Sequence, residues 1–458
     1  MTVTTLAACT PPDSETSVEA TGVGLTCTGQ KDKVVTTDYL GAREEIPGIS
    51  WDPVNIGHSA AAELLWSQPT SPSNEQFAAA WISKTNRMPF VRRYSTASTI
   101  KNFLGPQQQL GTISSPGWIR HLGFDDNCGQ EIPGAQTCAW FTWENDWGYV
   151  NWRAIGNNGN MSGLAYWPGH QPSGDTGQAF SGGQLVRKKL LAWISSDRTQ
   201  VKATLLYDNG LPIPGTERVL HTTSGNWKAY QTAVAWSSND ELWLVAWTEH
   251  TYPQQNPKMK GLVYTRYMDF NGSMGTYLNG IMYCEGNWWE AVCPGLKAAD
   301  PQVQPSADHV REGGNPWCLC KGFWLASSYY SGSAADRYRL QQYRVHARLN
   351  NAGIRQAIDQ NFLDLFSPIT EAGFWYGPDR TPFQALTKGG SNNTEHTRLV
   401  EGSFGEHLAG EVFGSPFSLG QAFRSDGSVA VALGTDGIQD QATALKLSIV
   451  DVKPRGCP

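Results

Sequence analysis

The sequence predicts an all-β protein built from four-stranded antiparallel sheets. The clearest copy of the unit lies at residues 230–272, where the apolar runs YQTAVAW, LWLVAW and LVYTRYMDF are separated by polar segments. The third run ends at Asn271-Gly272, a dipeptide that supplies the positive φ of a tight hairpin turn. These elements predict a meander whose fourth strand follows the Asn-Gly turn.

The same unit recurs along the chain. A tryptophan near the end of an apolar run marks successive copies about 50 to 60 residues apart, at Trp81, Trp143, Trp193 and Trp247. Diverged copies begin at Phe323 and Val429, and an irregular unit lies between them. One such sheet cannot bury both of its faces alone, so the repeat predicts the blades of a β-propeller stacked around an axis. Seven blades can be counted, with six as the alternative.

Composition agrees with this fold class and weighs against several functions. The 458 residues include 48 Gly and 19 Trp, which suits many short strands and tight turns. The net charge of −6, with no basic run longer than Arg187–Lys189, argues against a nucleic-acid partner. The sequence has no dinucleotide-binding, phosphate-loop or zinc-type motif, so we expect neither a cofactor nor a metal.

The first 45 residues differ from the rest, and we expect a flexible leader or tether at 1–45 before a propeller at 46–458. Leu6-Ala7-Ala8-Cys9 resembles a bacterial lipobox. This resemblance implies a bacterial exported propeller protein attached to a membrane only through a lipid on Cys9. A chance run of small residues ending in cysteine is the alternative.

The earliest β-rich run is Val34–Tyr39, and propeller rings are commonly closed by an N-terminal strand that completes the last blade. We therefore expect Val34–Tyr39 to pair with the blade that contains Val429–Asp451.

Cysteine spacing gives a second argument for export. Cys128 and Cys138, and likewise Cys284 and Cys293, are separated by short loops that do not match metal-ligand spacings, so we predict two disulfides. Disulfides persist in oxidising compartments, which favours an extracellular or cell-surface location. Reduced, buried cysteines are the alternative.

One segment departs from the strand pattern. Residues 354–366, IRQAIDQNFLDLF, place apolar side chains at helical spacing, which predicts a short helix inserted near 354–366. A diverged outer strand is the alternative.

Candidate site residues follow from the architecture. In a propeller, the turns after the second strand of each blade lie on one face, so polar residues far apart in sequence are expected to meet there. Candidates for acid or base chemistry are Glu144, Asp146, Asp197, Glu249 and His250. Candidates for ligand contact are Trp147, Arg198, Tyr329 and Tyr330, with Trp288 and Trp289 on a separate loop.

These observations favour an exported or surface-attached β-propeller that binds an extracellular glycan or protein through one face. A polysaccharide-degrading lyase or glycoside hydrolase on the same scaffold is the competing hypothesis, because carboxylates, His, Tyr and Arg also suit sugar chemistry. A purely structural surface component is a third. Core packing between blades competes with ligand binding for each tryptophan.

Overall fold

The fold was analysed in a computed structural model of the 458-residue chain. The structure describes residues 29–36, 60–66, 76–83, 85–95, 104–237, 241–251, 261–275, 279–281, 297–305, 323–330, 338–345, 363–365, 369–376, 382–388, 397–401, 407–413, 418–423, 429–435 and 445–451. Within these ranges, no helix is long and apolar enough to cross a membrane.

The described strands form seven sheets of four antiparallel strands, and we refer to each sheet by its first and last strand. The first three contain β2 (Ala60–Trp66), β3 (Gln76–Ile82), β4 (Pro89–Ser95) and β5 (Gln108–Gln109); β6 (Ile119–Asp125), β7 (Cys138–Glu144), β8 (Tyr149–Gly156) and β9 (Ala165–Pro168); and β10 (His170–Ser181), β11 (Gln184–Ile194), β12 (Gln200–Leu206) and β13 (Arg218–Thr222). The next three contain β14 (Trp227–Ser237), β15 (Leu242–Thr251), β16 (Gly261–Asp269) and β17 (Asn279–Ile281); β18 (Lys297–Pro305), β19 (Phe323–Tyr330), β20 (Tyr338–Val345) and β21 (Leu363–Leu365); and β22 (Ile369–Tyr376), β23 (Pro382–Lys388), β24 (Thr397–Glu401) and β25 (His407–Phe413). The last contains β26 (Ser418–Phe423), β27 (Val429–Thr435), β28 (Leu445–Asp451) and β1 (Gly29–Thr36).

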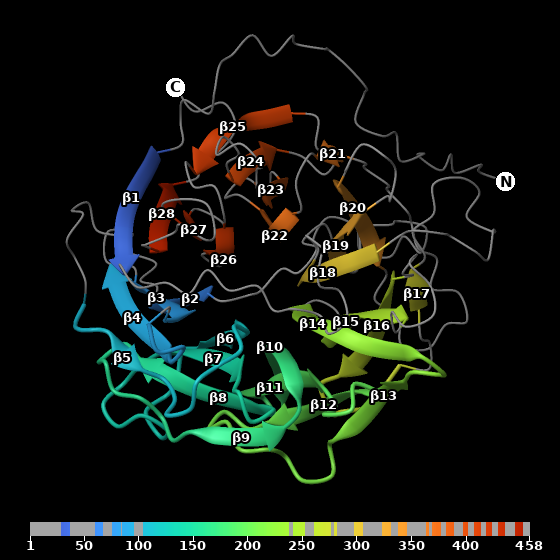
Figure 1. Ribbon diagram of the computed structural model, residues 1–458. Helices are drawn as coiled ribbons and strands as arrows, with labels where there is room; N and C mark the ends of the chain where they lie inside the picture. Colours follow the sequence, from blue (N-terminus) through green and yellow to red (C-terminus); the bar gives the residue numbers. More distant parts are fainter. Residues whose placement is uncertain are drawn as a thin grey trace, which may run out of the picture.

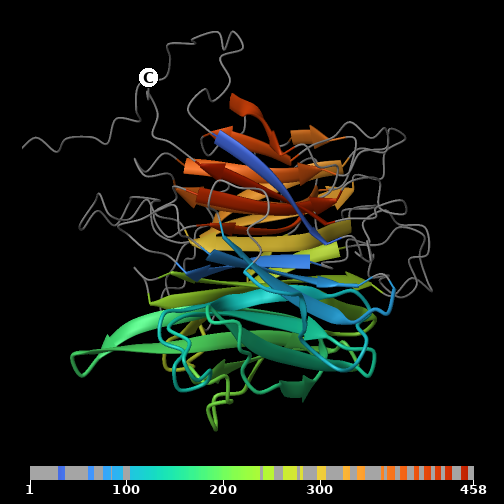
Figure 2. The same ribbon diagram turned by 90° about the vertical axis from the view of Figure 1, so that its left-hand side faces the viewer.

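The sheets are arranged as a ring, and the first strand of each lies nearest the centre (Figure 1). Each of these inner strands contacts the inner strand of the next sheet, from β2 through β6, β10, β14, β18 and β22 to β26 and back to β2. Seen from the side, the strands run between the two faces of the ring (Figure 2). The chain is therefore an all-β propeller, as its repeat predicts.

The ring is closed by strands from opposite ends of the chain. β1 pairs antiparallel with β28 from Gly29 opposite Asp451 to Thr36 opposite Leu445. The N-terminal strand was expected at Val34–Tyr39, and it begins earlier, at Gly29. This closing strand lies inside the 1–45 segment whose composition suggested a leader. Composition did not reveal it, because an outer strand contributes backbone hydrogen bonds and needs no run of large apolar residues.

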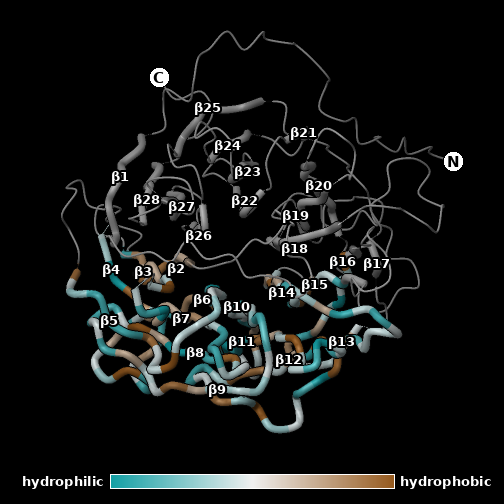
Figure 3. The backbone as a smooth tube through the Cα atoms, in the orientation of Figure 1, coloured by the Kyte–Doolittle hydropathy of each residue, from teal (hydrophilic) through white to brown (hydrophobic). Residues whose placement is uncertain are grey.

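The repeated tryptophans fill the spaces between sheets. Trp143 packs with Ala61 and Ile82 of the preceding sheet, and Trp193 packs with Trp140 and Trp152 of its preceding sheet. Trp247 likewise packs with residues of the β10–β13 sheet. These side chains are about 1% exposed or less. In Figure 3, hydrophobic residues, in brown, lie along the backbone around β2, β3 and β14.

Glycine makes room for two of these rings. A Cβ on Gly169 would lie 2.3 Å from Trp193 Cδ1, and one on Gly111 would lie 2.9 Å from Trp143 Cζ2. Both glycines follow the outer strand of the sheet that the tryptophan packs against. The tight stacking of sheets therefore depends on a missing side chain at these two points.

The predicted Asn-Gly turns close the third strands of three sheets. Gly159, Gly210 and Gly272 have φ values of 93°, 76° and 84°. Each donates its amide hydrogen to the carbonyl three residues earlier. An isolated bridge follows each turn, so the three connections are copies of one structure.

Cys128 and Cys138 form the predicted disulfide, with Cα atoms 6.0 Å apart. Both are buried; Cys128 lies in the connection between β6 and β7, and Cys138 is the first residue of β7. Cys9, Cys284 and Cys293 lie outside the described residues.

The helix expected near 354–366 is wrong for the part that the structure describes. Leu363–Leu365 is a strand, β21, and it pairs with β20. Leu363 and Leu365 obey the two-residue period of a strand, and only Leu365 also fits the helical spacing; the pairing with β20 makes the segment a strand. The remaining residues of the expected helix lie outside the description.

We expect the Cys128–Cys138 disulfide to stabilise the folded chain by about 2–3 kcal/mol, because it closes a short loop in the unfolded state. The paired change Cys128→Ser and Cys138→Ser should lower the unfolding free energy by this amount in denaturant titrations. Free thiols at both positions in unreduced peptide mass spectrometry would contradict the assignment.

Candidate functional site

One face of the ring carries the turns after the second strands, and we call it the turn face. It is formed by residues 83, 85–88, 145–148 and 195–199 together with the start of β10 at His170. The sharpest of these turns follows β7: Gly148 N donates to Asn145 O at 3.0 Å, and Gly148 has φ 74°. Asn145 Oδ1 accepts from the amides of Trp147 and Tyr149, both at 3.1 Å, which fixes the turn from inside.

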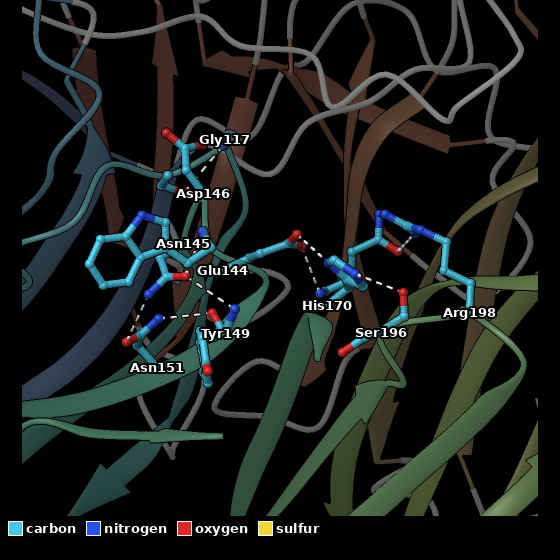
Figure 4. Close-up of polar contacts among 12 residues, drawn as sticks. Gly117, Glu144, Asn145, Asp146, Tyr149, Asn151, His170, Ser196 and Arg198 are labelled. Carbon is cyan, nitrogen blue, oxygen red and sulfur yellow. Dashed lines mark hydrogen bonds and ion pairs between the residues drawn. The ribbon is translucent and has the colours of Figure 1, made fainter. Parts of the chain in front are cut away.

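Glu144 and His170 form the central polar contact of the turn face. His170 Nδ1 lies 2.6 Å from Glu144 Oε1, and Gln171 N donates to Glu144 Oε2 at 2.9 Å. His170 Nε2 lies 3.3 Å from the carbonyl oxygen of Ser196 (Figure 4). Glu144 is 4% exposed, so the end of β7 is tied to the start of β10 and to the turn after β11 through a buried carboxylate. Both nitrogens of His170 therefore lie within hydrogen-bonding distance of an oxygen atom.

Arg198 and Gln171 make the next link around the axis. Gln171 Oε1 accepts from Arg198 Nη1 at 3.2 Å and from Gln231 N at 2.8 Å. The Arg198 guanidinium carbon also lies 4.8 Å from the centre of the Tyr230 ring. Arg198 therefore connects the turn after β11 to β14 of the next sheet, and its cation remains half-buried on the turn face.

Asp146 links the turn face in the other direction. Arg87 Nη2 lies 2.8 Å from Asp146 Oδ1, and Ser114 Oγ donates to Asp146 Oδ2 at 2.5 Å. The ion pair is partly exposed and joins the turn after β3 to the turn after β7.

Unusual backbone angles gather on this face. Among the described residues, five that are not glycine have positive φ, and four of them lie here: Arg87, Gln171, Arg198 and Gln231. Gln171 and Gln231 occupy equivalent bulges near the start of β10 and β14. Such conformations are uncommon outside glycine and concentrate at functional positions.

Asp197 shapes its own turn. Its carboxylate accepts from Ser195 Oγ at 2.6 Å and from Thr199 Oγ1 at 2.7 Å. These hydrogen bonds, Ser195 first, lower the pKa of Asp197 to about 2. Asp197 therefore stays ionised at neutral pH, which suits a turn-forming acceptor and does not suit a proton donor.

Trp147 is the most exposed aromatic side chain of the turn face, at 71%. Tyr166 on β9 is 66% exposed, and its ring meets the Tyr149 ring edge-on at 5.7 Å between centroids. Because Tyr149 is only two residues beyond Trp147, the three aromatic residues belong to one region of the β6–β9 sheet.

Glu249 occupies a different environment. It is 2% exposed, accepts from Trp247 Nε1 at 2.8 Å, and lies 3.2 Å from His221 Nε2 of β13. The His221 ring lies beside those of Trp247 and Tyr264, with centroids 5.9 and 5.3 Å away. Glu249 thus belongs to the interface between the β10–β13 and β14–β17 sheets, and its contacts are not those of the Glu144 group.

Burial changes the proton affinity of this pair in opposite senses. It raises the pKa of Glu249 to about 7, against a smaller lowering by the Trp247 hydrogen bond. It lowers the pKa of His221, as does the charge of Arg266. Burial therefore favours the uncharged form of each member of the pair.

Two carboxyl groups on inner strands were not identified from the sequence. Burial, followed by the charge of Asp175, raises the pKa of Glu63 to about 8, and burial raises the pKa of Asp175 to about 7. Their strands, β2 and β10, line the axis. The sequence offered no signal for them, because each is a single acidic residue within a strand.

The remaining predicted site residues cannot be placed by their side chains. His250 lies in β15 opposite Gly261, and Tyr329 and Tyr330 lie at the end of β19 opposite Ala298 and Lys297. Trp288 and Trp289 lie outside the described residues.

Metal ligation has one geometric candidate within the described side chains. The ligand-type atoms of Asp125, Cys128 and Cys138 lie within 4.8 Å of one another. The two sulfurs form a disulfide, and Asp125 pairs with Lys189 and accepts from Trp140 Nε1 at 2.9 Å. The two sulfurs are bonded to each other and cannot act as thiolate ligands, so the cluster does not fit a metal.

The candidates Glu144, Asp146 and Arg198 thus lie on the turn face, and the sequence did not identify His170, Arg87 and Gln171 as their partners. A signal for His170 was present: it follows Gly169 at a junction between two sheets, and such junctions share a face with the second-strand turns.

Comparison with known proteins bears on the fold alone. No protein-family model matches the sequence, and no curated protein sequence matches it either. The chain is similar in structure to the Dos1 propeller, with TM-score 0.41, 10% identity, and coverage of 82% of this chain and 74% of that one. It is similar to BBS1N in a complex with ARL6DN, with TM-score 0.45, 10% identity, and coverage of 84% and 89%. An endo-arabinase from Bacteroides thetaiotaomicron gives TM-score 0.33, 11% identity, and coverage of 59% and 90%.

The raised pKa of Glu249 predicts that its contribution to stability falls as pH rises. The folded chain binds this proton more tightly than the unfolded chain between the ordinary pKa of 4.5 and about 7, so stability is lost across that window. Glu249→Gln keeps an acceptor for Trp247 and does not titrate. We expect its unfolding free energy, relative to the parent, to rise between pH 5 and 8 by an amount on the order of 1–3 kcal/mol.

The measurement is a set of denaturant titrations at several pH values. His221 acts in the opposite sense near its own pKa, and comparing variant with parent at each pH reduces that common contribution. A constant difference between the two proteins from pH 5 to 8 would contradict the assignment.

Proposed function

We propose that this chain is an exported or surface-attached β-propeller that binds an extracellular glycan through the turn face. The observation that carries the proposal is Trp147, whose indole is 71% exposed at the tip of a turn that is itself fixed by hydrogen bonds. A large apolar ring presented to water by a rigid turn is preorganised to stack on a ligand. Sugars suit such a site because their C–H faces stack on aromatic rings while their hydroxyls need polar partners.

The polar groups around Trp147 support a sugar ligand. Asp146 and Arg87 are partly exposed and offer an acceptor and a donor, and the Asn145 amide holds the turn that places them. Their positions are fixed by the contacts between sheets, so binding needs little further ordering. The disulfide Cys128–Cys138 supports export, because such bonds persist in oxidising compartments.

A polysaccharide-degrading enzyme on the same scaffold is the second candidate, and the Glu144–His170 contact is the observation in its favour. A carboxylate beside a partly exposed histidine can move protons. Here both Glu144 oxygens and both His170 nitrogens already face groups of the protein. That arrangement favours a structural tie over a free acid or base, so we rank binding above catalysis.

A glycan array with the purified chain tests the proposal. We expect the parent to bind at least one glycan class, and Trp147→Ala to weaken that binding by about 5- to 150-fold, the range for one lost stacking contact by analogy with bases on aromatic rings. Phe180→Ala is the matched control: Phe180 is 77% exposed, and it lies near the far end of β10 from His170, on the opposite face.

Equal losses in Trp147→Ala and Phe180→Ala, or no loss in either, would contradict the turn face as the binding surface. Release of new reducing ends from the bound glycan, lost on Glu144→Gln, would instead establish the enzymatic candidate.

A further inference from the structure

We infer that the glycan site extends outward from Trp147 over Tyr149 and Tyr166, and that its ligand is a neutral polysaccharide chain several rings long. This inference rests on the proposed function and adds the class of ligand and the path it takes. The path runs along the side of the β6–β9 sheet that faces the β2–β5 sheet.

Strand register places the two tyrosines on that side. Tyr149 lies opposite Pro168, and Asn151 lies opposite Tyr166, so alternation puts Tyr149 and Tyr166 on the same side of the sheet. Their strand neighbours Trp152 and Trp167 pack toward the β10–β13 sheet with Trp193. The tyrosines therefore face the preceding sheet.

That preceding sheet leaves them uncovered. Its outer strand, β5, has only two residues, and the chain just after it meets Arg153 through a 3.2 Å hydrogen bond from Arg153 Nη1 to Leu110 O. Tyr149 lies four residues before Arg153, which is about 13 Å along an extended strand. A longer outer strand would cover the tyrosines, and the short one leaves Tyr166 66% exposed.

The aromatic rings are positioned by the fold. Tyr149 and Tyr166 meet edge-on at 5.7 Å, and the turn holding Trp147 is fixed by Asn145. We call Trp147, Tyr149 and Tyr166, which are exposed or half-exposed, the platform; each of these rings can stack on one sugar ring, by analogy with successive bases on aromatic side chains. A single terminal sugar would leave most of the platform in water, so a chain of about three rings fits it better.

Charge near the platform favours a neutral chain. Arg87 and Asp146 neutralise each other at 2.8 Å. Arg153, further along the same side, donates to Ser162 O and Leu110 O. The described side chains therefore offer hydrogen-bond partners for sugar hydroxyls. They do not form a cluster of charges of one sign, which an acidic or basic polymer would require.

The test is calorimetric titration of the full chain with neutral gluco-, manno-, galacto- and xylo-oligosaccharides, from single sugars to hexasaccharides. In the parent, affinity should rise with length up to about three rings and then level off. Tyr166→Ala should reduce trisaccharide affinity by about 5- to 150-fold and leave single-sugar affinity unchanged. Tyr166→Phe, which keeps the stacking ring, should bind as the parent does.

Tyr207→Ala is the control, because Tyr207 is 48% exposed and belongs to a third-strand exit on the opposite face. If no sugar of any length binds the parent, the proposed function fails. If binding needs Trp147 and shows neither a gain with length nor an effect of Tyr166→Ala, the extended path is overturned and the proposed function stands. Tighter, salt-sensitive binding of uronic-acid oligosaccharides would overturn the neutral ligand.

Discussion

A single four-stranded sheet has two faces to bury, and in this chain each sheet buries them against its neighbours. Trp143, Trp193 and Trp247 meet the need in the same way, by packing onto the preceding sheet. Gly111 and Gly169 leave space for two of these rings. Because every sheet depends on the next, the ring has to close, and the pairing of β1 with β28 supplies the backbone hydrogen bonds that close it.

The same dependence shapes the turn face. Polar residues at the ends of second strands lie where two sheets meet. Their polar groups bond to the neighbouring sheet, so fewer of them are left to bind a ligand. Glu144 binds the start of β10, and Asp146 binds Arg87 of the preceding turn. The interface between the β10–β13 and β14–β17 sheets is built differently. There His221 stacks on Trp247, and the buried carboxyl group of Glu249 contacts His221. Polar character at strand ends is thus weak evidence for catalysis in this fold.

The sequence predicted the repeat well because its signals are local. A tryptophan in a second strand is buried because of its size, and an Asn-Gly pair forms a tight turn because glycine accepts a positive φ. Both features lie at the positions that the sequence pattern predicted. Contacts across sheets were harder to predict, because they join residues that no local pattern connects. His170 meets Glu144 only when two sheets stack, and the exposure of Tyr166 depends on the shortness of β5. The helix expected near 354–366 failed for a related reason: apolar spacing is a local signal, and pairing with the edge of β20 makes Leu363–Leu365 a strand.

Trp143 and Trp147 show how position decides what a residue does. They are four residues apart and chemically identical, yet Trp143 is 1% exposed and Trp147 is 71% exposed. Trp143 belongs to β7 and faces a neighbouring sheet, where burial of its ring stabilises the stack. Trp147 stands after the strand has ended, on a turn whose conformation is fixed by Asn145 and Gly148, so the fold gains little from its ring. The ring of Trp147 therefore contributes little to folding, although its turn is held in one conformation. Ligand binding accounts for this arrangement better than packing does.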